Sequence, residues 1–176
     1  MKDVLIISSS PRIGGNSDTL CNEFARGCAE VGNSVDKISV ANKKIGYCTA
    51  CYACKETSQC ILADDMEGIL DKMVSADIIV LATPVYFYTM CAQMKTVIDR
   101  TLPRHTEIAN KDFYFIVTMA DSDKQAMERT LEGLRGFSAE CLYGAKEQGV
   151  IYGSGIWQLG DVLRSGAMKQ AYEMGK

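Results

Sequence analysis

The sequence predicts an α/β fold in which a parallel β-sheet carries helices on both faces. Three runs of residues, at 3–10, 77–84 and 112–119, are apolar at consecutive positions, which is typical of parallel strands covered on both sides. Segments with helical periodicity separate these runs. Such an alternation of strands and helices favours a doubly wound sheet with its helices on opposite faces.

Two weaker strands complete a predicted five-stranded sheet. One is the segment "SVDKISV" at 34–40, and the other lies near "AECLYGAK" at 139–146. In sheets of this kind, ligands bind beyond the carboxyl ends of the strands. The loops that follow the strands are therefore the segments in which we look for a site.

Five helices are predicted between and after the strands. Their apolar faces are marked by Leu20, Phe24, Cys28 and Val31; Met66, Ile69, Leu70 and Met73; Met94, Val97 and Ile98; Met127, Leu131 and Leu134; and Met168, Ala171 and Tyr172. The first helix should end at Gly32 and the second should begin at Asp64 or Asp65. Ser122 and Gln125 form a capping-box pattern ahead of the fourth helix.

Length and composition exclude several classes of protein. The chain has 176 residues, of which 47% are hydrophobic, so residues 1–176 are predicted to form one domain with a real core. A net charge of −3 gives no bulk attraction to nucleic acid or to anionic lipid. The longest apolar run is too short to span a membrane, and the N-terminus is interpreted as a strand and not as a signal peptide. We therefore expect a cytoplasmic protein without a nucleic-acid or membrane partner.

The loop after the first strand, "SSSPRIGGNSDT" at 8–19, has the composition of a phosphate-binding loop. It opens a helix, whose first N–H groups and positive dipole end suit an anion. The side chains predicted to bind there are Ser10, Arg12, Asn16, Ser17 and Thr19. The alternative is an ordinary turn capped by Asn16 or Ser17. The loop matches neither the G-x-G-x-x-G fingerprint nor the P-loop pattern, which disfavours a Rossmann dinucleotide site and an NTPase.

The segment "SPRIGGNS" resembles the phosphate loop of the flavodoxin-like NAD(P)H-dependent FMN reductases. The segment "TPVYFYTMCAQMKTVIDR" at 83–100 is similar to the flavin-ring loop and following helix of that family, and the likeness continues to the C-terminus. The resemblance implies a flavodoxin-like sheet in the strand order 2-1-3-4-5, with FMN as prosthetic group. It also implies NAD(P)H as cosubstrate and a homodimer or homotetramer.

The loop after the third strand, at 83–89, places apolar and aromatic surface at the edge of the sheet. A flat, mostly apolar isoalloxazine ring suits such a surface, although the same side chains could serve the core or a subunit interface. By resemblance, the residues expected at the flavin ring are Pro84, Val85, Tyr86, Phe87, Met119 and Ala120. Asp121 is expected to cap a helix.

A cysteine-rich loop at 47–61 holds four thiols with the spacing C-x2-C-x2-C-x5-C. They are Cys48, Cys51, Cys54 and Cys60. Closed zinc sites draw paired cysteines from two separated knuckles, whereas successive x2 intervals resemble the ligand runs of [4Fe–4S] proteins. The spacing also matches the motif of the iron–sulfur flavoproteins, a branch of the same family, although Ile61 stands where ferredoxins often have proline. Because this loop follows a strand at the ligand-binding edge, we expect the cluster near the flavin. The alternatives are four reduced thiols or a labile disulfide.

Other reactive or charged residues are predicted to have no role in a site. Arg100 and Arg104 are predicted to be solvated, although they could steer an NADPH phosphate, and His105 to lie in a surface turn. Trp157 is assigned to packing or to an interface. The remaining cysteines are expected to be small buried side chains: Cys21, Cys28, Cys91 and Cys141.

The predicted function is that of an FMN-dependent NAD(P)H oxidoreductase that passes electrons to a small-molecule or protein acceptor, with a [4Fe–4S] cluster as a further carrier. No catalytic side chain is predicted, because the flavin itself carries hydride chemistry. One alternative is a flavodoxin-like electron carrier that oxidises no nicotinamide. Another is a metal-binding regulatory module with a vestigial flavin site. The acceptor and the choice between NADH and NADPH stay open.

Overall fold

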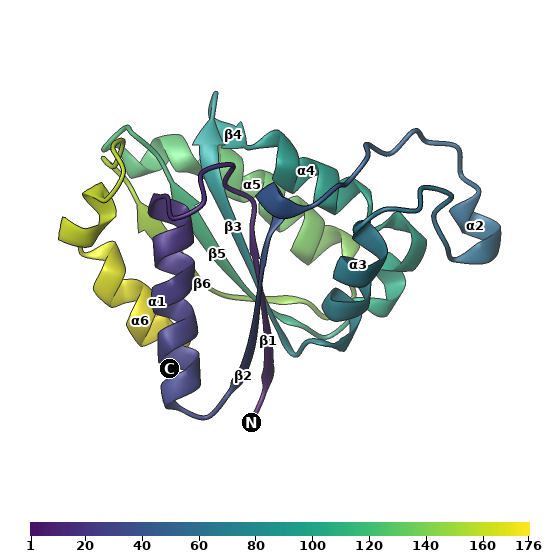
Figure 1. The fold of residues 1–176 in the computed structure, drawn as a ribbon, viewed down its shortest axis with the longest axis horizontal. Helices are drawn as coiled ribbons and strands as arrows, with labels where there is room; N and C mark the ends of the chain where they lie inside the picture. The colour runs from purple at the N-terminus through teal and green to yellow at the C-terminus, as the bar shows by residue number, and fades with distance from the viewer.

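The computed structural model describes residues 1–176 and is built around a parallel sheet (Figure 1). Its five parallel strands are β1 (Asp3–Ser8), β2 (Ser34–Ser39), β3 (Ile78–Tyr86), β5 (Asp112–Thr118) and β6 (Lys146–Gly153). They lie in the order β2-β1-β3-β5-β6, and every neighbouring pair is parallel. The predicted α/β class is confirmed, and so is the predicted order of the parallel strands.

A sixth strand, β4 (Thr89–Met90), departs from the predicted five-stranded sheet. It pairs antiparallel with the end of β3, so that Tyr86 lies opposite Thr89. β3 continues beyond the point where its parallel neighbour β1 ends, and its free edge there accepts the returning chain. Figure 1 shows the resulting hairpin projecting from the edge of the sheet at which the parallel strands end.

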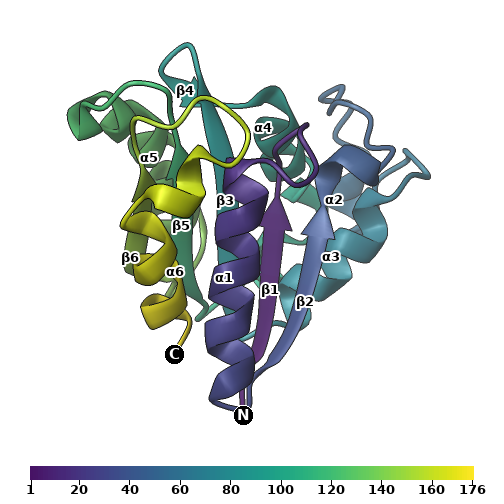
Figure 2. The ribbon, with the colours of Figure 1, turned by 60° about the vertical axis from the view of Figure 1, so that its left-hand side comes forward.

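Helices cover both faces of the sheet. The longer ones are α1 (Asn16–Glu30), α3 (Met66–Ser75), α4 (Ala92–Asp99), α5 (Glu128–Arg135) and α6 (Ala167–Gly175). Short helical turns are η1 (Val40–Asn42), α2 (Cys54–Thr57), η2 (Leu102–Glu107), η3 (Lys124–Met127), the π-helical η4 (Gly136–Glu140) and η5 (Asp161–Arg164). α1 and α6 lie side by side on one face (Figure 2), while α3, α4 and α5 pack on the other.

Two apolar layers fill the space between sheet and helices. One layer joins alternate residues of β1, β3 and β5 to α3, α4 and α5, and includes Phe113 and Phe115. The other joins the opposite residues of the same strands to α1 and α6, and includes Phe24. α1 and α6 approach closely at Gly27 and Gly175, where an added Cβ would lie 2.2 Å from a backbone oxygen of the other helix. No helix is both long and apolar enough to cross a membrane.

The strand predicted at 139–146 is wrong. Leu142 packs into the core from a turn, so its apolar character does not mark a strand. Gly144, with φ +68°, turns the chain into β6, which begins at Lys146. The sequence pattern places this strand too early, because β6 begins with polar residues and its buried residues Val150 and Ile151 come later.

Two smaller expectations about the helices and cysteines are also wrong. Asp123, and not Ser122, caps η3 by accepting the Gln125 N–H at 2.9 Å, because the helical turn begins one residue later than the pattern implies. Cys141 is exposed, since it follows the π-turn and leaves the core. By contrast, the end of α1 is as predicted, with Gly32 at φ +82°.

Candidate functional site

A cleft of about 350 Å³ lies at the carboxyl edge of the sheet, where the loops after β1, β3, β5 and β6 meet. Its volume falls within the range of small-molecule and cofactor sites. Its lining residues are Ser10, Arg12, Gly15, Asn16, Ser17, Pro84, Val85, Tyr86, Phe87, Tyr88, Thr118, Met119, Ala120, Asp121, Ile156 and Trp157. The structure therefore brings all but one of the predicted cofactor-binding residues together in a single cleft.

The exception is Thr19. Its hydroxyl donates a hydrogen bond back to the Gly15 carbonyl at 3.0 Å, within the first turn of α1, and it does not line the cleft. Thr118, which sequence reasoning missed, lines the cleft from the end of β5. Its hydroxyl lies 2.6 Å from the Ser17 hydroxyl, so the two side chains form a buried pair at the floor of the site.

The loop 8–19 has a backbone shape that suits an anion. The first N–H groups of α1 have no acceptor within the helix, and Gly15, Asn16 and Ser17 line the cleft. A Cβ at Gly15 would meet the Arg12 carbonyl oxygen at 2.8 Å, so only glycine fits there. Asn16 Nδ2 donates to the Gln158 carbonyl at 2.9 Å, which fastens the start of α1 to the loop after β6. Free N–H groups, hydroxyls and the Arg12 guanidinium form a donor set that fits a phosphate dianion.

Asp18 shapes the same loop, although nothing in the sequence pattern singled it out. Its buried carboxylate accepts the Gly14 N–H at 2.9 Å and pairs with Lys37 from β2 at 2.6 Å. Burial alone would raise the pKa of Asp18, but the bonds from Lys37 and Gly14 outweigh it and lower that pKa. Lys37 balances the charge of this carboxylate, so Asp18 adds no net negative charge beside the loop.

The aromatic loop is a tight hairpin whose two central residues, Phe87 and Tyr88, have φ values of 49° and 64°. Positive φ at both central positions defines a type I′ turn, for which Asn-Gly is the preferred pair. Bulky residues there store backbone strain, which tends to occur at functional sites. The Phe87 side chain borders the cleft and is fully exposed, so its burial does not offset this strain. The strain therefore indicates that Phe87 has a functional role and does not stabilise the fold.

Replacing Phe87 by asparagine should stabilise the protein. Asparagine tolerates the left-handed region, so we expect the free energy of unfolding to rise by about 1 kcal/mol, at the low end of the strain of one such residue. Urea unfolding of the flavin-free protein measures this change. Tyr143→Asn serves as the comparison, because Tyr143 is also an exposed aromatic residue in a turn but does not line the cleft and has no positive φ. A less stable Phe87→Asn variant would contradict the assignment of strain.

The cysteine loop leaves the sheet after η1 and returns at α3. Cys48, Cys51 and Cys60 are exposed, Cys54 is half-buried, and all four are free thiols. No three of them lie in a geometry that would hold a single metal ion. All four nevertheless line one small cavity of about 20 Å³, together with apolar side chains of the loop and of η2 and with the polar residues Thr49, Asp99 and Arg100.

The expected closeness of the thiols to the cleft at the carboxyl edge of the sheet is not found within one chain. Figure 1 shows α2, which begins at Cys54, projecting beyond α3 and α4 on the side away from α1. The cavity of the thiols and this cleft share no lining residue. The loop follows the ligand-binding edge in sequence, but its length carries the cysteines outward over the helices.

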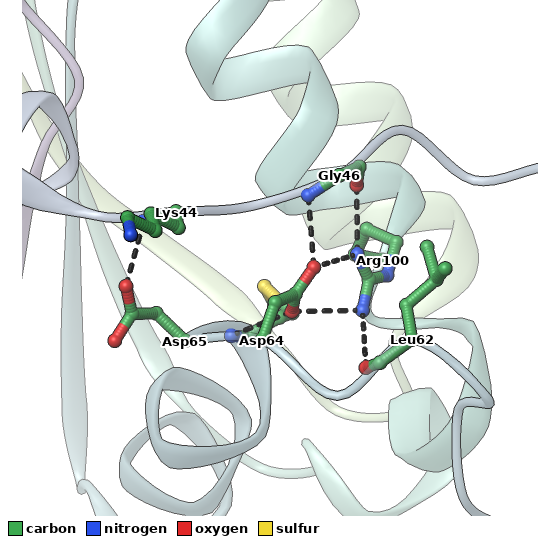
Figure 3. A network of polar contacts seen from close by, with 7 residues as sticks. Lys44, Gly46, Leu62, Asp64, Asp65 and Arg100 are labelled. Carbon is green, nitrogen blue, oxygen red and sulfur yellow. Dashed lines mark hydrogen bonds and ion pairs between the residues drawn. The ribbon is translucent and has the colours of Figure 1, made fainter.

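A network of polar contacts closes the base of the cysteine loop (Figure 3). Arg100, at the end of α4, donates through Nη1 to the Gly46 carbonyl and to Asp64 Oδ2, both at 2.7 Å. Its Nη2 donates to Asp64 Oδ1 at 3.0 Å and to the Leu62 carbonyl at 3.4 Å. Asp64 in turn accepts the Gly46 N–H at 2.8 Å. Gly46 and Leu62 flank the loop, so the two ends of the loop are tied together.

The prediction that Arg100 is solvated is wrong, since its side chain is only 2% exposed. Arg104 is partly exposed and pairs with Asp71 and Glu107. Burial alone would raise the pKa of Asp64, but hydrogen bonds from Arg100, Gly46 and Met66 outweigh it and lower that pKa. Arg100 and Asp64 therefore form an ion pair, and both carboxylate oxygens of Asp64 accept hydrogen bonds.

Comparisons with known proteins agree with this geometry. Residues 2–141 match the family model of NADPH-dependent FMN reductase. An iron–sulfur flavoprotein of Methanocaldococcus jannaschii is 43% identical over 100 residues, which are 57% of this chain and 52% of that protein. Another, from Archaeoglobus fulgidus, is 39% identical over 103 residues, 58% of this chain and 46% of that protein. The chain thus spans about half the length of the curated relatives it matches.

Solved structures show the same fold at low sequence identity. An FMN-dependent NADH-azoreductase from Bacillus anthracis, solved in complex with FMN, superposes with a TM-score of 0.75 at 16% identity, covering 99% of this chain and 98% of that one. An NAD(P)H:quinone oxidoreductase from Methanothermobacter marburgensis gives 0.72 at 15% identity, covering 99% and 95%. The predicted flavodoxin-like fold is confirmed, and so is the resemblance to the reductases and to their iron–sulfur flavoprotein branch. The match over residues 2–141 shows that this chain belongs to the family of NADPH-dependent FMN reductases.

Proposed function

We propose that this protein is an FMN-dependent NAD(P)H oxidoreductase whose residues 1–176 form one FMN-binding domain. The observation that carries the proposal is the cleft at the carboxyl edge of the sheet, where a phosphate-type loop and an aromatic loop face one another. Family membership supports FMN as the ligand. The names of solved proteins with the same fold support nicotinamide nucleotides as electron donors and small oxidants as acceptors.

Different residues of the cleft are assigned to different parts of the cofactor. We assign the phosphate to Ser10, Arg12, Asn16, Ser17 and the first turn of α1, which supply charge-assisted and backbone donors. The isoalloxazine ring is assigned to two segments, one on each side of the cleft: 84–87 and 119–120. When bound, FMN would supply the hydride and electron chemistry. The side chains then need only to bind, orient and partly cover it, which agrees with the absence of a predicted catalytic acid or base.

We further propose that Cys48, Cys51, Cys54 and Cys60 hold a [4Fe–4S] cluster as a second electron carrier. Four thiols in a C-x2-C-x2-C-x5-C run supply the number of ligands that a cubane needs. All four border one cavity, and the curated relatives are iron–sulfur flavoproteins by name. A cluster spreads its thiolates over several irons, so the absence of a site for one metal ion does not argue against it.

A homo-oligomer is the proposed assembly. Large apolar side chains stand exposed at the cleft and in the segment after β6: Phe87 and Trp157 line the cleft, and Leu159 and Leu163 follow Trp157 in the chain. An exposed apolar rim of this kind is typical of a surface that is covered in the functional state. Light scattering of the FMN-loaded protein would give the number of chains.

Anaerobic stopped-flow mixing of the FMN-loaded protein with NADH and with NADPH tests the proposed activity. We expect at least one nucleotide to bleach the flavin absorbance, after which a quinone should restore it. Dithionite serves as the control that the bound flavin can be reduced. If dithionite bleaches the flavin and neither nucleotide does, the protein is an electron carrier and not a reductase.

A further inference from the structure

The Arg100 guanidinium has one N–H group that the network at the base of the cysteine loop does not use. A guanidinium carries five N–H donors in a fixed planar fork. Four contacts engage Nη1 and Nη2, with Gly46, Leu62 and both oxygens of Asp64. The fifth donor, on Nε, is buried and has no partner. Buried donors in native proteins almost always have a partner, so this N–H group is available to an acceptor in the adjoining cavity.

The cavity next to Arg100 is the one that the four thiols line. Arg100 borders it with Cys48, Cys51, Cys54 and Cys60, and most of the remaining wall is apolar, with Thr49 and Asp99 as its other polar residues. The Arg100 guanidinium is the one cationic group in this lining. Hydrogen bonds from protein donors to the sulfurs are a general feature of iron–sulfur sites and help to set their potential.

We infer that Arg100 is a positioning residue for the sulfur ligands, which ties the ends of the cysteine loop through Nη1 and Nη2 and donates its Nε–H to a sulfur of the bound cluster. This inference rests on the proposed cluster. It explains why a buried arginine, with its charge balanced by Asp64, stands beside a pocket lined by four thiols. The same side chain would both hold the loop in shape and complete the surroundings of the cluster.

The inference predicts an effect on the reduction potential as well as on retention of iron. Reduction adds negative charge to a cluster, and hydrogen bonds to its sulfurs stabilise the reduced form. Lysine keeps the positive charge of arginine but has neither the planar fork nor an Nε–H. Arg100→Lys should therefore loosen the loop and lower the potential, while a residue that only stabilised the fold would leave the potential of the remaining cluster unchanged.

The experiment compares wild type, Arg100→Lys and the control Arg104→Lys, each loaded with FMN and reconstituted anaerobically with iron and sulfide. Arg104 is a partly exposed arginine four residues away that pairs with Asp71 and Glu107 and does not line the thiol cavity. Bound FMN reports that each variant is folded. Three quantities are measured: iron per chain, the midpoint potential of the cluster, and the rate at which trypsin cuts after Lys55 in the cluster-free protein.

We expect Arg100→Lys to retain FMN but less than half of the wild-type iron. Its remaining cluster should have a potential lower by about 59 mV, the equivalent of a tenfold change in the equilibrium constant of a one-electron couple. Cleavage after Lys55 should be several-fold faster, and Arg104→Lys should match the wild type in all three measurements. An Arg100→Lys variant that also matches the wild type would overturn the inference.

The cluster-free measurement separates this inference from the proposed function. Wild-type protein that takes up no iron would overturn the proposed cluster, and with it the donor role of Nε. Cleavage after Lys55 would then decide on the loop alone. A faster rate in Arg100→Lys supports the role of Arg100 in joining the two loop ends, and an equal rate contradicts that role.

Discussion

Replacing Cys51 by alanine should abolish the cluster and leave FMN binding unchanged. Wild-type protein prepared anaerobically should hold about four iron and four sulfide per chain, as a cubane requires. Cys51 is the middle thiol of the C-x2-C-x2-C run, so its loss breaks both short intervals at once. The flavin cleft shares no lining residue with the thiol cavity, which is why the yellow chromophore should persist. Iron and sulfide analysis, together with the visible spectrum, measures both cofactors in one sample.

The matched control for this substitution is Cys141→Ala. Cys141 is also an exposed, free thiol, but it follows the π-turn and lies outside the cysteine loop. Its loss should change neither iron nor FMN. Full iron content in Cys51→Ala would show that the ligand set is wrong, and iron near zero in reconstituted wild type would leave an FMN-only oxidoreductase.

Sequence reasoning found most of the sheet because parallel strands have a strong local signal. β1, β3 and β5 are buried on both faces, so each is a continuous apolar run that cannot be confused with a surface helix. β6 begins with exposed polar residues, and only its second half is buried. Its position is set by pairing with β5, which a local pattern does not contain.

The meeting of the two predicted segments in one cleft was predictable for the same kind of reason. Because parallel strands end at one edge, loops that follow the strands meet there whatever their own sequence, and the two predicted segments face one cleft. Thr118 and Trp157 also line it, but through the placement of β5 and of the loop after β6. Neither residue type, taken alone, indicates a flavin site.

The network around Arg100 could not be predicted from local sequence. Its partner Asp64 lies 36 residues earlier, and their meeting depends on how α4 packs beside the start of α3. An arginine at the end of a helix is most often solvated, and this one is buried because the loop folds over it. The outward course of the cysteine loop has the same origin. Both features belong to the tertiary structure and not to the motif.

Arg12 is the one cationic side chain that lines the flavin cleft. Its Nη1 lies 3.5 Å from the Trp157 carbonyl, a long contact that leaves the other donors of the guanidinium free for a ligand. It stands next to the first turn of α1, whose free N–H groups would donate to the same phosphate. A charged hydrogen bond of this kind contributes about 1.5–3 kcal/mol.

Replacing Arg12 by alanine should therefore raise the dissociation constant of FMN between about 10-fold and 150-fold, at 1.4 kcal/mol for each factor of ten. Lysine at this position should recover part of the loss, because it keeps the charge but not the planar fork. Fluorescence titration of the flavin-free protein with FMN measures all three constants. Arg26→Ala is the control, since Arg26 lies on the exposed face of α1 and pairs only with Glu23 and Tyr172. Its removal takes the same charge from the chain, at a site outside the cleft, and should leave the dissociation constant unchanged. If Arg12→Ala binds FMN as tightly as Arg26→Ala, the phosphate is held without Arg12.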